Sequence, residues 1–334
     1  MRRVEYLRPT DDATATVAAL REWLAADAPP SLLIETSGSS GAPKRVVLPR
    51  SAVLASARAT ARRLGECGPW SLVLPASYVA GVQVLVRCLL GGHEPVLDGW
   101  GDAAYTSLVP TQLHRMLTSA EDLAALRSMR AVLLGGGPLD PVLRHRAEDA
   151  GLRVVATYGS SETAGGCVYD GHPLDGVAVA LGVAGRIRIG GPVLFAGYDG
   201  DAALTAQTLV DGWFLTSDAG RFDDDGRLHV LGRLDDVVIS GGVNVPLPAV
   251  AARLREHPAV EAAEVLGVPD DEWGQRVVAF VVAPLGVGAS TGELRDFVAA
   301  AHPRAWAPRE VVLLDALPLL GNGKVDRTAL RELT

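Results

Sequence analysis

Between residues 70 and 157, short apolar runs of strand length alternate with segments whose apolar residues recur at helical spacing. The pattern predicts strands at 70–74, 95–97, 107–109, 131–134 and 154–157, and helices at 82–90, 111–117 and 141–150. Such alternation is typical of parallel sheets covered by helices, in which ligands bind at the carboxyl ends of the strands. We therefore expect an α/β fold.

The pattern differs at the two ends of the chain. Residues 17–24 predict an amphipathic helix that stops before Pro29-Pro30, and 49–66 predict a second helix rich in alanine and arginine. From 185 to 231, short alternating strands are separated by glycine and aspartate turns, which predicts a small β subdomain. From 237 onward, strands and helices mix on a smaller scale.

Composition narrows the function classes. The chain has 334 residues, of which 48% are hydrophobic and 21% charged, and a formal net charge of -8. The negative charge argues against a nucleic acid partner. Neither a signal peptide nor a membrane span is predicted, and three dispersed cysteines (Cys67, Cys88 and Cys167) indicate buried thiols in a reducing cytoplasm. The 7 histidines show no metal-ligand spacing, so a zinc enzyme is not expected.

A polar loop lies between two apolar runs near the start of the chain. Its residues of interest are Thr36, Ser37, Gly38, Ser39, Ser40, Gly41 and Lys44. Glycines let the backbone approach an anion, hydroxyls add donors and the lysine adds a positive charge, which suits nucleotide phosphates. Pro43 precedes Lys44, so this is not a Walker loop. The structural alternative is a flexible serine- and glycine-rich surface turn.

Three further motifs carry polar residues that suit a nucleotide. Tyr158-Gly159-Ser160-Ser161-Glu162-Thr163 follows a predicted strand and offers an aromatic ring for a base and a carboxylate for Mg²⁺. Thr216-Ser217-Asp218 is followed by Gly232-Arg233-Leu234-Asp235, and Gly321-Asn322-Gly323-Lys324 lies near the C-terminus. Each motif alone is equally explained as a helix cap or a solvated turn.

In this order and at these distances, the motifs resemble the signature series of the adenylate-forming superfamily. This superfamily comprises acyl- and aryl-CoA ligases, nonribosomal-peptide adenylation domains and luciferases, and the resemblance runs from about Leu32 to the C-terminus. It implies ATP, Mg²⁺ and CoA as cofactor and co-substrates. It also implies a large N-terminal domain (1–234) with mainly parallel, helix-covered sheets and a small β subdomain, and a small mobile α+β domain (235–334).

The resemblance further implies roles for individual residues. The loop from Thr36 to Lys44 would close over the β- and γ-phosphates, and Lys324 would stabilise charge in the adenylation transition state. It also assigns adenine and acyl contacts to Gly135, Gly136, Gly137, Tyr158 and Gly159. Ser161 would contact phosphate, Glu162 would hold Mg²⁺, and Asp218 with Arg233 would bind the ribose. Asp235 would form the hinge, and Gly241 with Gly242 would line the pantetheine tunnel.

The substrate assignment depends on the short region before the phosphate loop. Compact actinobacterial o-succinylbenzoate–CoA ligases of menaquinone biosynthesis resemble this arrangement. Their Pro-x-x-aromatic-x-x-Gly element corresponds to Pro75 through Gly81 with Tyr78, and the arginine thought to bind the second carboxylate corresponds to Arg87. A buried arginine needs an anion, although snorkelling or pairing with a protein carboxylate is the alternative. Tyr78 replaces a common histidine and Arg45 a common glycine. The short N-terminal region leads us to expect a homodimer that completes the acyl pocket.

Other functions remain open from the sequence. The protein is an acyl- or aryl-CoA ligase for another acid, or a stand-alone enzyme that loads a carrier protein, or a non-catalytic protein that binds a nucleotide or acyl-adenylate. Loss of Lys324, Glu162 or Asp218 would mark the last class, yet all three are present. A serine hydrolase is disfavoured because no Gly-x-Ser-x-Gly elbow occurs.

Overall fold

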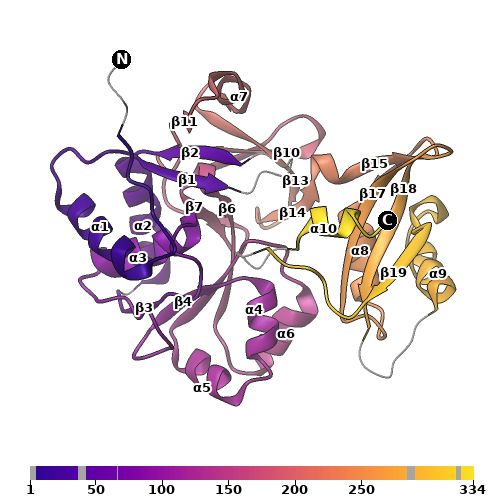
Figure 1. Ribbon diagram of the computed structural model, residues 1–334, viewed down its shortest axis with the longest axis horizontal. Coiled ribbons are helices and arrows are strands. Elements are labelled where there is room, and N and C mark those ends of the chain that lie inside the picture. Colours follow the sequence, from indigo (N-terminus) through magenta and orange to yellow (C-terminus); the bar gives the residue numbers. More distant parts are fainter. Residues whose placement is uncertain (1–4, 37–42, 66, 284–289, 321–324) are drawn as a thin grey trace. The chain divides into compact units, whose positions relative to one another are not determined.

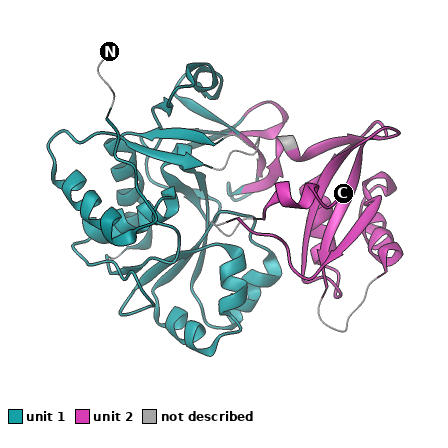
Figure 2. Cartoon of the chain, in the orientation of Figure 1, with its two compact units in different colours: residues 1–181, 188–216, 222–228 teal, residues 182–187, 217–221, 229–334 magenta. Residues whose placement is uncertain are grey.

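A computed structural model describes residues 5–36, 43–65, 67–283, 290–320 and 325–334. The contacts divide the chain into two compact units (Figure 2). Unit 1 comprises 1–181, 188–216 and 222–228, and unit 2 comprises 182–187, 217–221 and 229–334. This division places two short segments before residue 229 with the C-terminal unit, so it is not a single cut at 235. The domain boundary at Asp235 stays a prediction.

The largest sheet belongs to unit 1 and has the order β3-β4-β5-β6-β7-β8. Its strands are parallel from β3 to β6 and antiparallel from β6 to β8. The strands are β3 (Trp70–Ser71), β4 (Tyr105–Leu108), β5 (Ala131–Leu134), β6 (Val154–Ser160), β7 (Gly165–Tyr169) and β8 (His172–Pro173). The helices of unit 1 are α1 (Ala13–Ala25), α2 (Arg50–Leu64), α3 (Val79–Leu90), α4 (Pro110–Met116), α5 (Ala120–Ser128), α6 (Pro141–Asp149) and α7 (Ala202–Thr208).

Helices cover both faces of this sheet because successive strand residues point to opposite sides. On β5, Val132 and Leu134 pack in one core with residues of α4, α5 and α6. Ala131 and Leu133 pack in another core with residues of α2 and α3. The helices α4, α5 and α6 form one group in Figure 1. The predicted parallel sheet covered by helices is therefore confirmed.

A second sheet of unit 1 holds the two ends of the glycine-rich loop. It has the order β1-β2-β11, with β1 (Leu32–Thr36), β2 (Lys44–Leu48) and β11 (Gly197–Tyr198). The strands β1 and β2 are antiparallel, and Thr36 lies opposite Lys44. The loop therefore leaves one strand and returns to its neighbour. Ser37, Gly38, Ser39, Ser40 and Gly41 lie outside the described residues.

A third sheet has the order β12-β13-β10-β9, with β14 beside β13. The strands are β9 (Ala178–Leu181), β10 (Arg186–Gly190), β12 (Leu209–Val210), β13 (Trp213–Phe222) and β14 (Leu228–Arg233). These short strands confirm the β texture that the sequence predicted between 185 and 231. One 3₁₀ turn, η1 (Ser161–Thr163), connects β6 to β7, and another, η2 (Val183–Gly185), connects β9 to β10.

Unit 2 contains a sheet of order β16-β15-β18-β17, with β19 parallel to β18. Its elements are η3 (Leu234–Asp236), β15 (Val237–Ser240), β16 (Val243–Pro246), α8 (Leu247–Arg255), β17 (Ala262–Asp270), β18 (Gly274–Val282), α9 (Thr291–Ala301), η4 (Arg304–Trp306), β19 (Glu310–Leu314) and α10 (Arg327–Arg331). The core against α8 and α9 contains Val277 and Val281, whereas Val278 and Phe280 pack with Leu330 of α10. Helices therefore cover both faces of this sheet too.

Several predicted boundaries differ from the structure. The strand expected at 70–74 is only two residues long, and the one at 95–97 reduces to a bridge between Ser71 and Val96. This is the edge of the sheet, where pairing ends early. Helix α3 begins at Val79, three residues before the predicted start. Of the helices in the described part of the chain, none combines the length and the apolarity that crossing a membrane requires.

Candidate active site

The carboxyl ends of β5 and β6 bring two of the predicted motifs together. The parallel register places Leu134 beside Ala156, so Gly135 follows one strand next to Thr157 and Tyr158 on the other. A Cβ at Gly135 would meet the Thr157 hydroxyl oxygen at 2.5 Å, and Gly136 has φ of 79°. Only glycine fits such a close approach. Gly135, Gly136, Gly137, Tyr158 and Gly159 therefore belong to one edge of the sheet.

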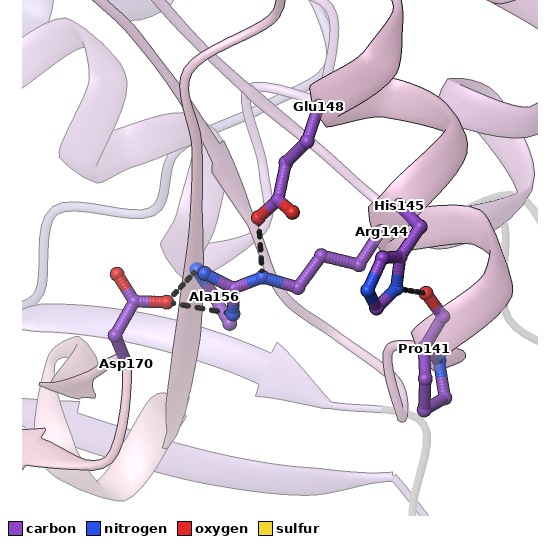
Figure 3. Close-up of polar contacts among 6 residues, drawn as sticks. All are labelled: Pro141, Arg144, His145, Glu148, Ala156 and Asp170. Carbon is purple, nitrogen blue, oxygen red and sulfur yellow. Dashed lines mark hydrogen bonds and ion pairs between the residues drawn. The ribbon is translucent and has the colours of Figure 1, made fainter.

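A network behind this edge fixes β6 (Figure 3). The Asp170 carboxylate accepts from the Ala156 backbone N–H at 3.1 Å and pairs with Arg144 of α6 at 3.0 Å. The Arg144 guanidinium also donates to Glu148, one turn further along α6, at 2.8 Å. The strand that carries Tyr158 is thereby held to α6 and to the residue that follows β7.

A tight turn after β6 presents Glu162. The Thr163 hydroxyl accepts from the Ser160 backbone N–H at 2.9 Å and donates to the Gly165 carbonyl at 2.7 Å. Ala164 takes a left-handed conformation with φ of 50°. A Cβ at Gly159 would meet the Gly165 carbonyl oxygen at 2.2 Å, so the turn requires glycine there. Ser161 is buried, and Glu162 is half-buried on the same turn.

Two residues of the later chain hold Glu162. The Tyr198 hydroxyl donates to its Oε1 at 2.8 Å, and the Phe195 backbone N–H donates to its carbonyl at 2.9 Å. Burial, and then the charge of Glu162, raise the pKa of Tyr198 far above its usual value. The phenol therefore stays protonated and acts as a donor. Tyr198 was not predicted, because it is 36 residues from Glu162 and no local pattern connects them.

Lys44, at the other end of the phosphate loop, lies close to Tyr198. Its Nζ lies 5.6 Å from the centroid of the Tyr198 ring. The Thr36 hydroxyl donates to the Lys44 carbonyl at 3.4 Å and so closes the loop at its base. The structure thus brings Lys44 and Glu162 together around Tyr198, with Thr36 bonded to Lys44.

The donor set around Glu162 fits a magnesium ion. Mg²⁺ prefers oxygen ligands and is commonly held by one or two carboxylates together with substrate phosphates. Glu162 supplies such a carboxylate, oriented by Tyr198. Within the described ranges no three metal-binding side chains gather into a complete protein cage. The arrangement suits an ion that a nucleotide completes.

Helix α3 packs against the turn that carries Glu162 and reaches Trp70 of β3. The Gln83 side-chain amide donates to the Ala164 carbonyl at 2.9 Å and to the Val53 carbonyl of α2 at 3.2 Å. Gln83 was not predicted, although a buried glutamine in an apolar helix is a visible signal. Tyr78 is the residue before α3, and its backbone N–H donates to the Pro75 carbonyl at 3.2 Å.

Arg87 lies one helical turn beyond Gln83 and contacts a cavity. Its guanidinium carbon is 5.4 Å from the centroid of the Trp70 ring, and its buried Nε has no hydrogen-bond partner. Burial lowers the pKa of Arg87. The cavity has a volume of about 280 Å³, and its lining includes Thr60, Trp70 and Arg87. Tyr78 is roughly 13 Å away along the helix axis, so these two predicted substrate residues are not brought together.

The other predicted residues lie in unit 2. Asp218 is on β13, Arg233 ends β14, and Asp235 is in the η3 turn. Gly241 and Gly242 form the turn between β15 and β16, with φ of 57° and 78°. The side chain of Asp235 and all of Lys324 lie outside the described residues.

A charged cluster in unit 2 was not predicted. Arg327 donates to the Glu264 carboxylate at 2.8 Å and to the Asp236 carboxylate at 2.7 Å. Burial lowers the pKa of Arg327, but the charge of Glu264 and the bond to Asp236 outweigh it and raise the pKa overall. The partners are 63 and 91 residues away in sequence, so no local motif reveals them.

Together, the glycine-rich edge, the aromatic residue and the acidic turn define a nucleotide-binding enzyme. Residues 9–187 match the family model described as AMP-binding enzyme, and 249–324 match the AMP-binding enzyme C-terminal domain. The chain belongs to the AMP-binding enzyme family. Its class is that of the AMP-forming acyl-CoA ligases, and the resemblance seen in the sequence is confirmed.

Individual relatives support this class. The chain is 42% identical to a probable 2-succinylbenzoate–CoA ligase of Mycobacterium tuberculosis, with 94% of this chain and 87% of that protein aligned. It is similar to o-succinylbenzoate CoA synthetase from Bacillus subtilis in complex with the acyl-adenylate intermediate, with a TM-score of 0.79 and 28% identity. That match covers 90% of this chain and 68% of the other. The same synthetase in complex with ATP and magnesium ion gives a TM-score of 0.78 at 28% identity, covering 90% and 69% of the two chains.

Proposed function

We propose that this protein activates o-succinylbenzoate with ATP and transfers the acyl group to CoA, releasing AMP and pyrophosphate, as a step of menaquinone biosynthesis. The Mycobacterium tuberculosis relative carries the corresponding ligase name, and the Bacillus subtilis synthetase was solved with its acyl-adenylate and with ATP and magnesium ion. The match over nearly the whole chain supports the same two-step reaction here.

The phosphates of ATP belong at the group formed by Thr36, Lys44 and Glu162. When the substrate carboxylate attacks the α-phosphate, negative charge grows on the phosphate oxygens and on the departing pyrophosphate. Lys44 supplies a positive charge at the base of the loop, and Glu162 would hold a magnesium ion. When bound by Glu162, such an ion would neutralise charge on the leaving group.

The nucleoside belongs at the glycine-rich edge. Tyr158 offers an aromatic face for adenine, while Gly135, Gly136, Gly137 and Gly159 would admit the backbone close to the ligand. Ser161 would contact the phosphates. Asp218 and Arg233 would bind the ribose hydroxyls, Lys324 would serve the adenylation step, Asp235 would act as the hinge, and Gly241 with Gly242 would line the pantetheine tunnel. These roles follow from the family resemblance of each motif.

One observation carries the choice of acid: the guanidinium of Arg87 borders a cavity whose described lining contains no carboxylate. No carboxylate of the described residues pairs with it, and its Nε is left unpaired in the interior. An arginine in such surroundings is stabilised by a carboxylate in bidentate contact. Gln83 fixes the same helix to the Glu162 turn, and we propose that the acid places one carboxylate near the turn and a second at Arg87. Tyr78, at the start of this helix, would contact the acyl group.

The test is product analysis by mass spectrometry. The enzyme is incubated with ATP, Mg²⁺ and CoA, and with o-succinylbenzoate, benzoate or a fatty acid in parallel. We expect o-succinylbenzoyl-CoA and AMP from the first acid only. An adenylate without a thioester would indicate another acceptor, such as a carrier protein, and an inert o-succinylbenzoate would contradict the substrate assignment.

A further inference from the structure

We propose that Tyr198 is a positioning residue for adenylation: its hydroxyl orients the Glu162 carboxylate for the metal while its ring faces the Lys44 ammonium. The proposal rests on the proposed function, because it assigns Glu162 and Lys44 to the phosphates. Tyr198 itself touches neither nucleotide nor acid in this account. It acts through the two residues that do.

The backbone and the ring of Tyr198 are both fixed. The residue ends β11, where it pairs with Val46 of β2, and its side chain is buried. Its backbone N–H donates to the Thr205 hydroxyl at 2.8 Å. The ring meets Phe195 edge to face, with 5.0 Å between centroids. A side chain held at so many points has little rotational freedom, so its hydroxyl defines a fixed position for Glu162.

The Tyr198 hydroxyl orients the Glu162 carboxylate. It donates a hydrogen bond to Oε1 at 2.8 Å. Partners of this kind orient the carboxylates that bind metals, and their loss typically weakens metal binding by about 10- to 100-fold. The hydroxyl of Tyr198 therefore belongs to the metal site although it makes no bond to the metal.

The ring connects the same residue to the phosphate loop. A distance of 5.6 Å between Lys44 Nζ and the ring centroid is within the range of cation–π attraction. Lys44 begins β2, and Tyr198 lies on the adjacent strand β11. One side chain thus contacts both Lys44 at the base of the loop and Glu162 of the turn.

Tyr6, which binds the residue that follows Tyr198, supplies a matched control. Asp199 accepts from the Tyr6 hydroxyl at 3.2 Å and pairs with Arg45 at 3.3 Å. This pairing also accounts for Arg45, which joins β2 to the residue that follows β11. Tyr6→Phe therefore removes a tyrosine–carboxylate bond from the same sheet region, but one that does not involve Glu162.

The experiment measures ATP binding by calorimetry with and without Mg²⁺ for the wild type, Tyr198→Phe and Tyr6→Phe. Tyr198→Phe keeps the ring and loses the hydroxyl. We expect it to weaken binding of ATP with Mg²⁺ about tenfold, to leave binding of ATP alone unchanged, and to recover at high Mg²⁺. Tyr6→Phe should match the wild type in both. Equal binding of ATP with Mg²⁺ by wild type and Tyr198→Phe would overturn the proposal.

A double variant separates a positioning effect from a folding defect. In a Glu162→Gln background, the hydroxyl of Tyr198 has no metal-binding carboxylate to orient, so Tyr198→Phe should cause no further loss of Mg²⁺-dependent binding. An equal loss in both backgrounds would contradict the role.

The wild type alone tests the proposed function: if it binds no ATP, the proposed function and this inference both fail. If the wild type binds ATP normally, the inference about Tyr198 is decided by how much more weakly Tyr198→Phe binds ATP with Mg²⁺ than the wild type does.

Discussion

Two arginines, one in each unit, have opposite surroundings. Arg87 of unit 1 lies against the Trp70 ring beside a cavity and has no carboxylate partner among the described residues. Arg327 of unit 2 is bound by the carboxylates of Glu264 and Asp236. Burial lowers the pKa of the first, whereas its carboxylate partners raise the pKa of the second.

The contrast indicates what each arginine does. A partly buried cation that protein carboxylates already satisfy contributes to structure, and here it connects η3, β17 and the start of α10. A buried cation without such partners costs stability and is retained where a ligand supplies the anion. Arg87 is therefore interpreted as a substrate contact and Arg327 as a structural clamp of unit 2.

The largest expected effect follows from Arg87→Met. Methionine keeps most of the side-chain volume but loses the charge, so kcat/KM for o-succinylbenzoate should fall about 100-fold, the loss of roughly 3 kcal/mol from a charge-assisted pair. Steady-state kinetics measures this. Arg188→Met is the matched control, since Arg188 also stacks on a tryptophan at 5.4 Å and also has a buried, unpaired Nε. Equal losses in both variants would contradict a specific role for Arg87.

Arg327→Met should instead affect stability. Removal of the cation leaves the Glu264 and Asp236 carboxylates without their partner, and we expect the free energy of unfolding to fall by about 2 kcal/mol. Urea denaturation measures this change. Arg331→Met, an exposed arginine on the same helix, serves as the control and should change stability little. An unchanged stability of Arg327→Met would remove the distinction between the two arginines.

The stability of Arg87→Met should change in the opposite direction. The substitution removes a half-buried charge that no carboxylate of the described residues compensates, so the free energy of unfolding should rise by about 1 kcal/mol in the absence of substrate. Thermal unfolding without ligand is the appropriate measurement. A clear destabilisation would mean that the guanidinium already has a stabilising partner in the free protein.

The smallest effect concerns the pH dependence of unit 2. Burial raises the pKa of the Glu264 carboxyl above its usual value, although the charge of Arg327 acts the other way. A raised folded-state pKa means that the folded protein holds the proton more tightly. The contribution of Glu264 to stability is therefore fully present below the usual carboxyl pKa and is lost as pH rises through the folded-state value. Denaturation at several pH values should show this fall in the wild type and not in Glu264→Gln.

The sequence predicted the elements better than their ends. Alternation of apolar runs was sufficient for the helix-covered parallel sheet, because Ala131 through Leu134 are buried on both faces. It failed at β3 and at Val96, where a sheet edge rather than local composition decides how far pairing extends.

The site was predictable only where its residues form local motifs. Gly135 to Gly137 and Tyr158 to Thr163 each form a contiguous motif, which the sequence predicts as part of the site, and their roles stay predictions. Tyr198 and Arg327 act on partners 36 to 91 residues away, and such contacts depend on the packing of strands that no local pattern specifies. Their roles became visible only from the fold.

The most direct test of the substrate assignment is a discrimination ratio. We would measure kcat/KM for o-succinylbenzoate and for 4-oxo-4-phenylbutanoate, which lacks the ring carboxylate, in the wild type and in Arg87→Met. If Arg87 binds the second carboxylate, the wild type should prefer the diacid by about 100-fold and the variant should show almost no preference. The same preference in both enzymes would contradict the assignment of Arg87.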